Sequence, residues 1–344
     1  MRRRYGGHRG PDTRSPGRRP GPRPPVPTSM RDPRLTEQRN PRSEGIDRLG
    51  AREIVELINR EDREVARAVG AEAPAIARAV ELVVEALRRG GRLIYVGAGT
   101  SGRLGILDAA EMPPTFGTDP ERVQGIIAGG YEALVRAREG AEDRPADGAA
   151  AVDERGMGPD DVVLGIATSG TTPYVHGALD RARERGARTG FLLCTPPSDE
   201  LRATHDVVIA PLVGPEVITG STRMKAGTAT KLVLNSITTG AMVLLGKVHG
   251  NLMVDLQVSC RKLQDRAERI LMELVAVDRD RARDLVDEAG GQVKTALVME
   301  EAGVGREEAL RRLEAAGGVV ARAVAGLPES HVAETGAGTG DRPR

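Results

Sequence analysis

The sequence has no tryptophan, and aromatic residues make up only 2% of it. Proteins that bind single-stranded nucleic acids stack the bases on aromatic side chains, so this shortage argues against that class of protein. The charge balance agrees with this exclusion. The 50 basic and 49 acidic residues leave a formal net charge of +1, with no excess to attract a phosphate backbone. We therefore expect no nucleic-acid partner.

Cysteines and long apolar runs are also scarce. The two cysteines, Cys194 and Cys260, do not form a CxxC pair, so they predict neither a disulfide framework nor a thiolate metal site. The longest apolar stretch, residues 232–245, is broken by Asn235 and Ser236 and is more typical of a buried helix than of a membrane span. From these absences we expect a cytoplasmic protein with no bound metal and no membrane contact.

The two ends of the chain differ in composition from its middle. Residues 1–34 are crowded with Arg, Pro and Gly and hold too few apolar side chains to build a core, which predicts a disordered tail. They lack the apolar segment of a secretory signal peptide, and Met30, near which the composition becomes ordinary, is a candidate translation start. Residues 327–344 are expected to form a loose tail.

Between these tails, strand and helix patterns alternate. Apolar residues at helical spacing predict helices over 53–69 and 75–89. Strands are then expected at 93–96, 122–127, 162–167, 189–194 and 206–210, and helices at 101–110, 131–139 and 173–186. Such alternation is typical of an α/β fold with helices layered on a mostly parallel sheet. From residue 221 onward the pattern is helical, with a long helix over 221–246 and a C-terminal helical bundle after it.

The first predicted strand runs into a glycine-rich turn with two hydroxyl groups, Gly97-Ala98-Gly99-Thr100-Ser101-Gly102. A helix is predicted to begin in this turn, and the N–H groups of its first turn are unpaired and lie at the positive end of the helix dipole. Such helix ends bind anions, and glycine lets the backbone approach them closely. We therefore expect a phosphate group to be bound by Gly99, Thr100, Ser101 and Gly102.

Two further hydroxyl-rich turns precede predicted helices. They are Thr168-Ser169-Gly170-Thr171-Thr172, and Ser221-Thr222 with Lys225 close behind it. Each turn alone is explained as well by Ser and Thr capping a helix. The first two glycine-containing turns follow parallel strands, however, so they meet at the carboxyl edge of the sheet, where α/β proteins bind ligands. Together the three turns predict a phosphate-monoester pocket that also includes Ser169, Gly170, Thr171, Thr172, Ser221, Thr222 and Lys225.

A nucleotide cofactor is the competing interpretation, because Gly97, Gly99 and Gly102 spell G-x-G-x-x-G. A dinucleotide site also needs an acidic residue at the end of the second strand to hold the ribose. That strand instead runs into Ala128-Gly129-Gly130, and no Walker motif occurs in the sequence. The sequence therefore favours a sugar phosphate over a nucleotide.

Seven segments resemble the N-acetylmuramic acid 6-phosphate etherases, a family of sugar isomerase (SIS) domain proteins. They are LTEQRNPRSEGIDRLG (35–50), VGAGTSGRLGILDAAEMPPTFG (96–117), IAGG (127–130), EGAED (139–143), GIATSGTTPYV (165–175), TGSTRMKAGTATKLVLN (219–235) and GKVHGNLMVD (246–255). The resemblance implies a layered αβα SIS domain over 35–260, with an N-terminal helical extension, and a helical subdomain over 261–326. It also implies a homodimer whose site draws on both subunits, with no metal or organic cofactor.

The activity implied by this resemblance is cleavage of the D-lactyl ether of N-acetylmuramic acid 6-phosphate. The products are N-acetylglucosamine 6-phosphate and D-lactate, and the role is recycling of bacterial cell-wall sugars. An ether at C3 resists hydrolysis, but opening the sugar ring makes the C2 proton acidic. A base can then remove that proton while an acid protonates the leaving lactyl oxygen, and water adds back at C3.

Two acids of the family map onto Glu111 and Glu142. By resemblance, Glu111 protonates the lactyl oxygen and Glu142 removes the C2 proton. Local sequence also supports an acid at 111, because a rigid, partly desolvated setting before Pro113-Pro114 raises a carboxyl pKa. Glu142 lies in an acidic turn that by itself is typical of solvated surface. The chain departs from the family at Cys260, where the etherases usually have an asparagine.

Two other functions fit the same motifs. An aldose–ketose isomerase would use the same phosphate turns and one glutamate as the base, without forming lactate. A non-catalytic sugar-phosphate sensor, which the animal glucokinase regulator exemplifies, would bind the ligand and a partner protein. The presence of both glutamates and the shortness of the chain favour the etherase.

Overall fold

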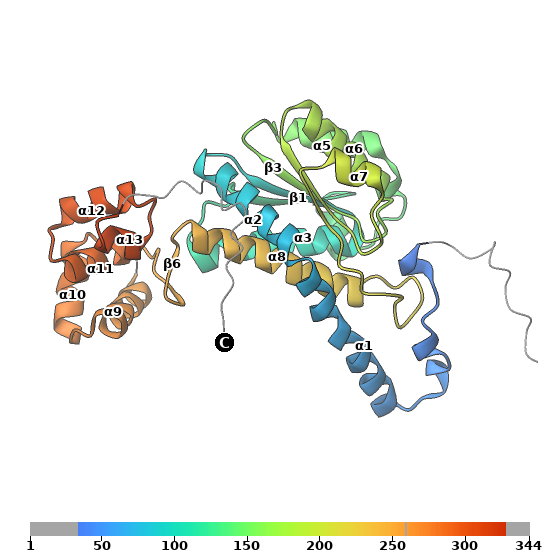
Figure 1. Cartoon of the computed structure of the whole chain (residues 1–344), viewed down its shortest axis with the longest axis horizontal. Coiled ribbons are helices and arrows are strands. Elements are labelled where there is room, and N and C mark those ends of the chain that lie inside the picture. The colour runs from blue at the N-terminus through green and yellow to red at the C-terminus, as the bar shows by residue number, and fades with distance from the viewer. Residues whose placement is uncertain (1–33, 259, 328–344) are drawn as a thin grey trace, which may run out of the picture.

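A five-stranded sheet and a group of C-terminal helices form the two lobes of the molecule (Figure 1). The computed structural model describes residues 34–258 and 260–327. The predicted N-terminal tail, apart from Arg34, and the candidate start at Met30 lie outside the described residues. So does the predicted C-terminal tail beyond Leu327.

The sheet consists of β1 (Leu93–Gly97), β2 (Val123–Ile127), β3 (Val162–Ile166), β4 (Arg188–Leu192) and β5 (Val207–Ile209). Neighbouring strands are parallel, in the order β2-β1-β3-β4-β5. Every residue of β1 and β3 is buried, as parallel strands covered on both faces require. The predicted α/β class with a parallel sheet is confirmed.

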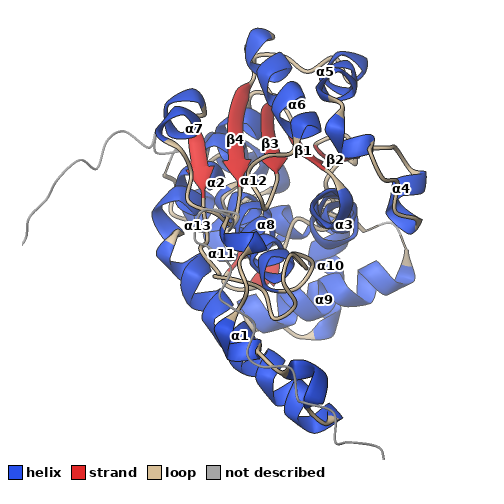
Figure 2. Ribbon diagram, turned by 90° about the vertical axis from the view of Figure 1, so that its right-hand side faces the viewer, coloured by secondary structure: helices blue, strands red, loops and turns tan. Residues whose placement is uncertain are grey.

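Helices cover both faces of this sheet (Figure 2). One face carries α2 (Ala73–Arg88), α3 (Gly99–Phe116) and α8 (Lys225–Leu244); the other carries α5 (Pro145–Glu154) and α6 (Pro173–Glu184). Leu93 and Tyr95 of β1 join the first core, and Ile94 and Val96 join the second. This division follows from the two-residue period of a strand, so β1 ties the two layers together.

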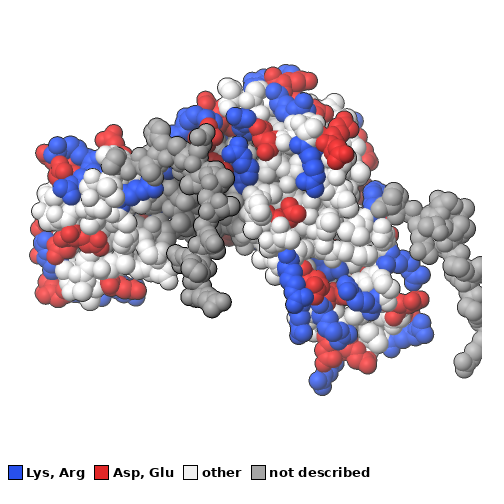
Figure 3. Space-filling view, in the orientation of Figure 1, with Lys and Arg blue, Asp and Glu red and all other residues white. Residues whose placement is uncertain are grey.

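The remaining elements of this lobe are short or peripheral. α1 (Ala51–Ala71) precedes α2 and packs against α8. The others are α4 (Glu132–Val135), α7 (Asp199–Thr204) and the 3-10 turns Leu35–Glu37, Pro41–Ser43, Ile46–Arg48 and Ala141–Asp143. On the face seen in Figure 3, the described residues of α1 carry interspersed charges of both signs. Pairs such as Arg52–Glu56 on this helix are spaced for ion pairing along its surface.

The C-terminal lobe is a bundle with its own hydrophobic core. Its helices are α9 (Arg261–Val275), α10 (Arg279–Glu288), α11 (Val293–Ala302), α12 (Arg306–Ala315) and α13 (Val320–Val324). The short hairpin of β6 (Val248–His249) and β7 (Leu252–Met253) connects α8 to this bundle. Leu271, Leu285 and Leu297, from three different helices, are fully buried in its core. The bundle therefore has an apolar interior independent of the sheet.

Helix α3 differs most from the prediction. It does not stop at residue 110 but continues through Pro113 and Pro114 to Phe116, and Gly117 then ends it in the left-handed region at φ 60°. Prolines remove helical hydrogen bonds, but α3 packs on β1, β2 and α8 along its length. Tertiary packing, which supplies most helical stability in proteins, keeps this helix continuous. Glu111 is therefore a mid-helix residue.

Other boundaries shift for local reasons. The helix predicted from residue 221 begins only at Lys225, which leaves Ser221 and Thr222 in the turn before it. The helix predicted over 131–139 is limited to α4. The sequence pattern does not predict α5 or α7. Helix α5 is rich in alanine, with Val152 as its one larger aliphatic residue, so it lacks an apolar periodicity.

Helices α5 and α6 approach each other through two glycines. A Cβ atom at Gly148 would lie 2.0 Å from the carbonyl oxygen of Tyr174, and one at Gly177 would lie 2.1 Å from that of Pro145. Backbone atoms cannot rotate away as a flexible side chain can. This contact holds the segment before α5, which includes Glu142, against the start of α6.

We predict that Gly148→Ala lowers the free energy of unfolding by about 3 kcal/mol, because the new methyl group forces the two helices apart. Urea denaturation measures this change. The control is Gly70→Ala in α1, where nothing lies within 4 Å of the added Cβ. There the better helix propensity of alanine should raise stability by up to about 1 kcal/mol. If Gly148→Ala lowers the free energy of unfolding by no more than Gly70→Ala changes it, the close contact between α5 and α6 is contradicted.

Candidate functional site

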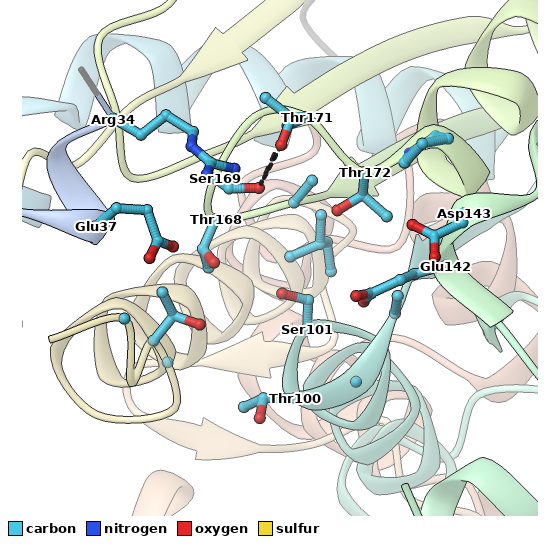
Figure 4. A pocket seen from close by; sticks show the side chains of 18 residues that line it. Arg34, Glu37, Thr100, Ser101, Glu142, Asp143, Thr168, Ser169, Thr171 and Thr172 are labelled. Atoms are coloured by element: carbon cyan, nitrogen blue, oxygen red, sulfur yellow. Dashed lines mark hydrogen bonds between the residues drawn. The ribbon is translucent and has the colours of Figure 1, made fainter. Parts of the chain in front are cut away.

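A cavity of about 490 Å³ opens at the carboxyl ends of β1 and β3 (Figure 4). The turns after these two strands form its floor, and segments from three other regions form its walls. The polar side chains that line it belong to Arg34, Glu37, Thr100, Ser101, Glu142, Asp143, Thr168, Ser169, Thr171, Thr172 and Thr222. In Figure 4, Arg34 and Glu37 lie on one side of the cavity, and Glu142 and Asp143 lie on the other.

The turn after β1 presents the open N-terminus of α3. Ala98 occupies the N-cap position and has no side-chain hydrogen bond that would satisfy the first N–H groups of the helix. Gly97 and Gly102 are required here, because a Cβ at Gly97 would lie 2.6 Å from the backbone nitrogen of Gly102. Gly99, Thr100 and Ser101 line the cavity, whereas Gly102, which is also expected to bind phosphate, supports the turn from behind it.

The turn after β3 is organised by its own hydrogen bonds. The hydroxyls of Ser169 and Thr171 lie 3.1 Å apart, and the backbone nitrogen of Thr171 donates to Ser169 Oγ. Gly170 does not line the cavity; it supplies the positive φ of 77° that the turn needs, and its carbonyl lies 2.9 Å from His176 Nε2. Ser169, Thr171 and Thr172 thus present hydroxyl groups beside the open end of α3.

The third predicted turn contributes less than expected. Thr222 lines the cavity together with Gly220 and Gly227, but Ser221 and Lys225 do not. Lys225 is fully buried, and its ammonium group donates to Glu61 Oε2 at 2.9 Å. The structure therefore corrects the expectation that Lys225 supplies charge to the phosphate pocket from this chain.

The buried ion pair of Lys225 is part of a polar cluster under the cavity wall. Glu61 also accepts hydrogen bonds from Asn40 Nδ2 at 2.7 Å and from Arg42 at 3.0 Å. Burial by itself raises the pKa of Glu61, but the hydrogen bonds from Arg42, Lys225 and Asn40 outweigh it and hold the pKa at about 2. Glu216 accepts from the backbone nitrogens of Lys225 and Ala226, which closes the N-terminus of α8. The cluster fixes the segments that carry Arg34 and Thr222.

The two glutamates predicted to act together lie apart in one chain. Glu142 is exposed and lines the cavity, in the 3-10 turn Ala141–Asp143. Glu111 is also exposed but does not line the cavity. It lies ten residues after Ser101 in the same helix, which at 1.5 Å per residue is about 15 Å along the axis of α3. The partly desolvated setting expected for Glu111 is not present in the single chain.

Several lining residues were not predicted from sequence. Arg34 and Glu37 come from the start of the described chain. Hydrogen bonds from Asn40 and Ser43 to the carbonyl oxygens of residues 215 and 217 hold that segment beside the cavity, and the backbone nitrogen of Gly220 donates to Thr36 O. Only the family resemblance of residues 35–50 pointed to this segment. Thr168, which belongs to the second hydroxyl-rich turn, and Asp143, which follows Glu142 in the chain, also line the cavity. No local pattern distinguishes either of them from a surface residue.

Two further observations bear on the chemistry of the site. Among residues 34–258 and 260–327, no group of three or more His, Cys, Asp or Glu side chains is arranged to hold a metal ion. Within the same ranges, no helix is both long and apolar enough to cross a bilayer. The groups available in the cavity are hydroxyls, backbone N–H groups, carboxylates and one guanidinium.

Comparison with known proteins gives matches over most of the chain. The family model of the glucokinase regulatory protein N-terminal SIS domain matches residues 75–183. An N-acetylmuramic acid 6-phosphate etherase of Synechococcus elongatus is 54% identical over 275 residues, which cover 80% of this chain and 89% of that protein. One of Salinibacter ruber is 54% identical over 291 residues, covering 85% of this chain and 94% of the relative. A solved phosphoheptose isomerase from Francisella tularensis aligns with 56% of this chain and 100% of its own, at 18% identity and a TM-score of 0.40.

The polar cluster predicts a dependence of stability on acid. Because the pKa of Glu61 is about 2 in the folded protein and 4.5 is its ordinary value, ionised Glu61 favours the folded state. That contribution is fully present above about pH 4.5 and is lost as the pH falls toward 2. Glu61→Gln should therefore flatten the fall in the free energy of unfolding across this window, as urea denaturation at several pH values would show.

At neutral pH the same substitution leaves buried Lys225 without its carboxylate, so we expect a loss of about 3–5 kcal/mol. Glu56→Gln on the same helix is the control, because Glu56 pairs with Arg52 on the exposed surface of α1. It should change stability by less than about 0.5 kcal/mol. Equal pH profiles for the Glu61→Gln and wild-type proteins would show that the cluster does not hold Glu61 ionised.

Proposed function

The chain belongs to the N-acetylmuramic acid 6-phosphate etherase family, and we propose that it binds the phosphate of its substrate in the cavity between β1 and β3. It is an enzyme that cleaves the D-lactyl ether of N-acetylmuramic acid 6-phosphate in amino-sugar recycling. The convergence of two helix N-termini and a cluster of hydroxyls on one cavity is the observation that supports this location.

The phosphate is bound by neutral donors in this proposal. The N-terminus of α3 offers backbone N–H groups at the positive end of its dipole, beside the hydroxyls of Thr100 and Ser101. Ser169, Thr171 and Thr172 add hydroxyl donors from the turn before α6. Gly99 lets the backbone approach the phosphate, while Gly102 and Gly170 shape the two turns. Thr222 completes the wall, with Ser221 and Lys225 holding the turn that carries it.

Glu142 is the base in this proposal. Its place in the wall of the cavity, on the side away from Arg34 and Glu37 (Figure 4), supports the assignment that the family resemblance gives. Removing the C2 proton next to the aldehyde creates the electron pair that expels lactate from C3. Water then adds to the unsaturated aldehyde. A positioned base typically contributes about 10²–10⁴-fold to such a step.

Glu111 acts as the acid from the other subunit of a homodimer in this proposal. The separation of about 15 Å along α3 exceeds the reach of a glutamate side chain toward a sugar held at Ser101 of the same chain. Glu111 is exposed on its helix and therefore accessible to a second copy. A symmetric dimer would bring each Glu111 to the partner's cavity, and contact between copies would supply the desolvation that keeps a carboxyl group protonated.

We also propose a cytoplasmic location. Cys194 is buried, Cys260 is exposed, and both are free thiols, as is usual for proteins of a reducing compartment. Sugar phosphates are cytoplasmic metabolites because their charge prevents them from crossing membranes unaided.

We predict that Glu142→Gln lowers D-lactate release from N-acetylmuramic acid 6-phosphate by at least about 10²-fold and stops exchange of the C2 proton with solvent deuterium. Glu111→Gln should also abolish lactate release. Mass spectrometry of the sugar and an enzymatic lactate assay measure these outcomes. Glu139→Gln, a neighbouring exposed residue that does not line the cavity, is the control and should retain activity. Continued C2 exchange in Glu142→Gln would assign the base to another residue, and ketose formation without lactate would identify an isomerase.

The two-subunit site predicts complementation. Glu111→Gln and Glu142→Gln proteins are each inactive alone, but mixing them in equal amounts after dissociation should restore roughly a quarter of wild-type activity. Half of the dimers would then be mixed, and each mixed dimer would hold one intact site out of two. If both glutamates served the same chain, every site would lack one acid and no activity would return.

A further inference from the structure

A second cavity of about 430 Å³ lies at the opposite end of α8 from the substrate cavity. Gly227 of α8 lines the first cavity and Met242 lines the second, and these residues are 15 positions apart. At 1.5 Å per residue they are about 23 Å apart along the helix axis. The second cavity is also formed by the turn between α3 and β2, the hairpin after α8, and the start of α11. It therefore lies where the sheet lobe meets the bundle, away from the proposed chemistry.

Positive charge dominates the walls of this cavity. Lys247 and Lys294 both pair with Asp255, and the distance from Lys294 Nζ to Asp255 Oδ1 is 3.0 Å. One carboxylate cannot neutralise two ammonium groups, so a unit of positive charge is left over. Burial lowers the pKa of Lys294, and the pairing with Asp255 offsets this lowering only in part. Lys294 is only 13% exposed, so water screens this charge poorly.

Arg122 adds a third cation from the sheet lobe. Its guanidinium donates to the carbonyl oxygen of Leu87, and among the described residues it forms no ion pair. Asp119 also lines the cavity, and its carboxylate accepts from the backbone nitrogen of Glu121. Three basic and two acidic side chains thus line one cavity.

Thr118 supplies an independent observation. Thr118 is among the residues that line this cavity, and its hydroxyl oxygen is buried beside it with no hydrogen-bond partner among the described residues. Only one other described side-chain atom, Thr36 Oγ1, shares this state. Thr36 is a neighbour of Glu37, which lines the substrate cavity. Buried hydroxyl groups almost always have a hydrogen-bond partner. A buried hydroxyl without a protein partner therefore points to a bound ligand or an ordered water.

We propose that this second cavity binds a small oxyanion, a phosphate monoester or a carboxylate, between Thr118, Arg122, Lys247 and Lys294. The hydroxyl of Thr118 donates to an oxygen of the anion, and the three cations balance its charge. Because these residues belong to the sheet lobe, the hairpin and the bundle, a bound anion links the two lobes. The tighter the anion binds, the more it stabilises the arrangement in which the bundle is docked on the sheet lobe.

Hydrogen–deuterium exchange of the full-length chain, with and without inorganic phosphate, tests this proposal. Binding should slow exchange of the backbone amides at 117–122 and 247–255, because a ligand that bridges these segments opposes their opening. Amides at 98–102 and 168–172 report the substrate cavity separately, so failure at one site is distinguishable from failure at the other. Parallel arms with glucose 6-phosphate and with D-lactate identify a phosphate ester or a carboxylate as the preferred anion.

Two variants remove single contacts. Lys294→Met keeps the apolar stem of the side chain and should weaken the phosphate-dependent slowing at 117–122 at least ten-fold. Thr118→Val removes a hydroxyl that has no protein partner, so it should weaken phosphate binding several-fold without lowering the melting temperature. Lys262→Met, which changes an exposed lysine on α9, is the control and should bind phosphate as the wild type does.

The proposal is overturned if tens of millimolar phosphate slow exchange only at 98–102 and 168–172. It is also overturned if Thr118→Val binds phosphate as tightly as the wild type, which would assign an ordered water to the hydroxyl. Sodium chloride at matched ionic strength must leave amide exchange at 117–122 and 247–255 unchanged. Slower exchange in sodium chloride would mean that salt acts by screening charges and not by binding as a specific anion. If Lys294→Met does not fold, Thr118→Val decides the outcome.

Discussion

The pairing of β1 with β3 is the contact on which the proposed substrate cavity depends. Gly97 lies opposite Ile166 in this parallel ladder, so the turns that follow the two strands leave the same edge of the sheet side by side. From there α3 crosses to one face of the sheet and α6 to the other. Such a point, where the chain leaves toward opposite faces, opens a crevice between two helix N-termini. The donors that suit a phosphate follow from this one arrangement.

The cavity wall is also constrained by a buried group of charged residues that do not line the cavity. Lys225 opens α8, where the helix dipole disfavours a cation, and Glu216 and Glu61 compensate for it from outside the helix. The hydrogen bonds that Glu61 accepts from Asn40 and Arg42 bring in the N-terminal segment, which contributes Arg34 and Glu37 to the cavity. A buried ion pair of this kind is costly to break and specifies one arrangement of the wall it supports.

The substrate cavity of one chain is better equipped for binding than for chemistry. It has the donors that a phosphate needs but holds Glu142 without Glu111. Acid and base with separate roles need different environments, one protonated and the other ionised. Placing the two carboxylates on different subunits, as we propose, gives each its own surroundings. It also makes activity depend on assembly, because neither chain alone completes the site.

The amino-acid sequence by itself determined the fold class and the two hydroxyl-rich turns after β1 and β3. The strands are short apolar runs buried on both faces, and the turns at 97–102 and 168–172 owe their shape to glycines and to helix starts nearby in the chain. Only the tertiary structure decided that Lys225 is buried against Glu61, 164 residues away, and that Arg34 reaches the cavity. It also decided that α3 continues through Pro113 and Pro114, so that Glu111 lies within the helix and outside the cavity of its own chain. Local preferences act within a few residues, whereas these placements depend on packing between segments far apart in the chain, which no short pattern encodes.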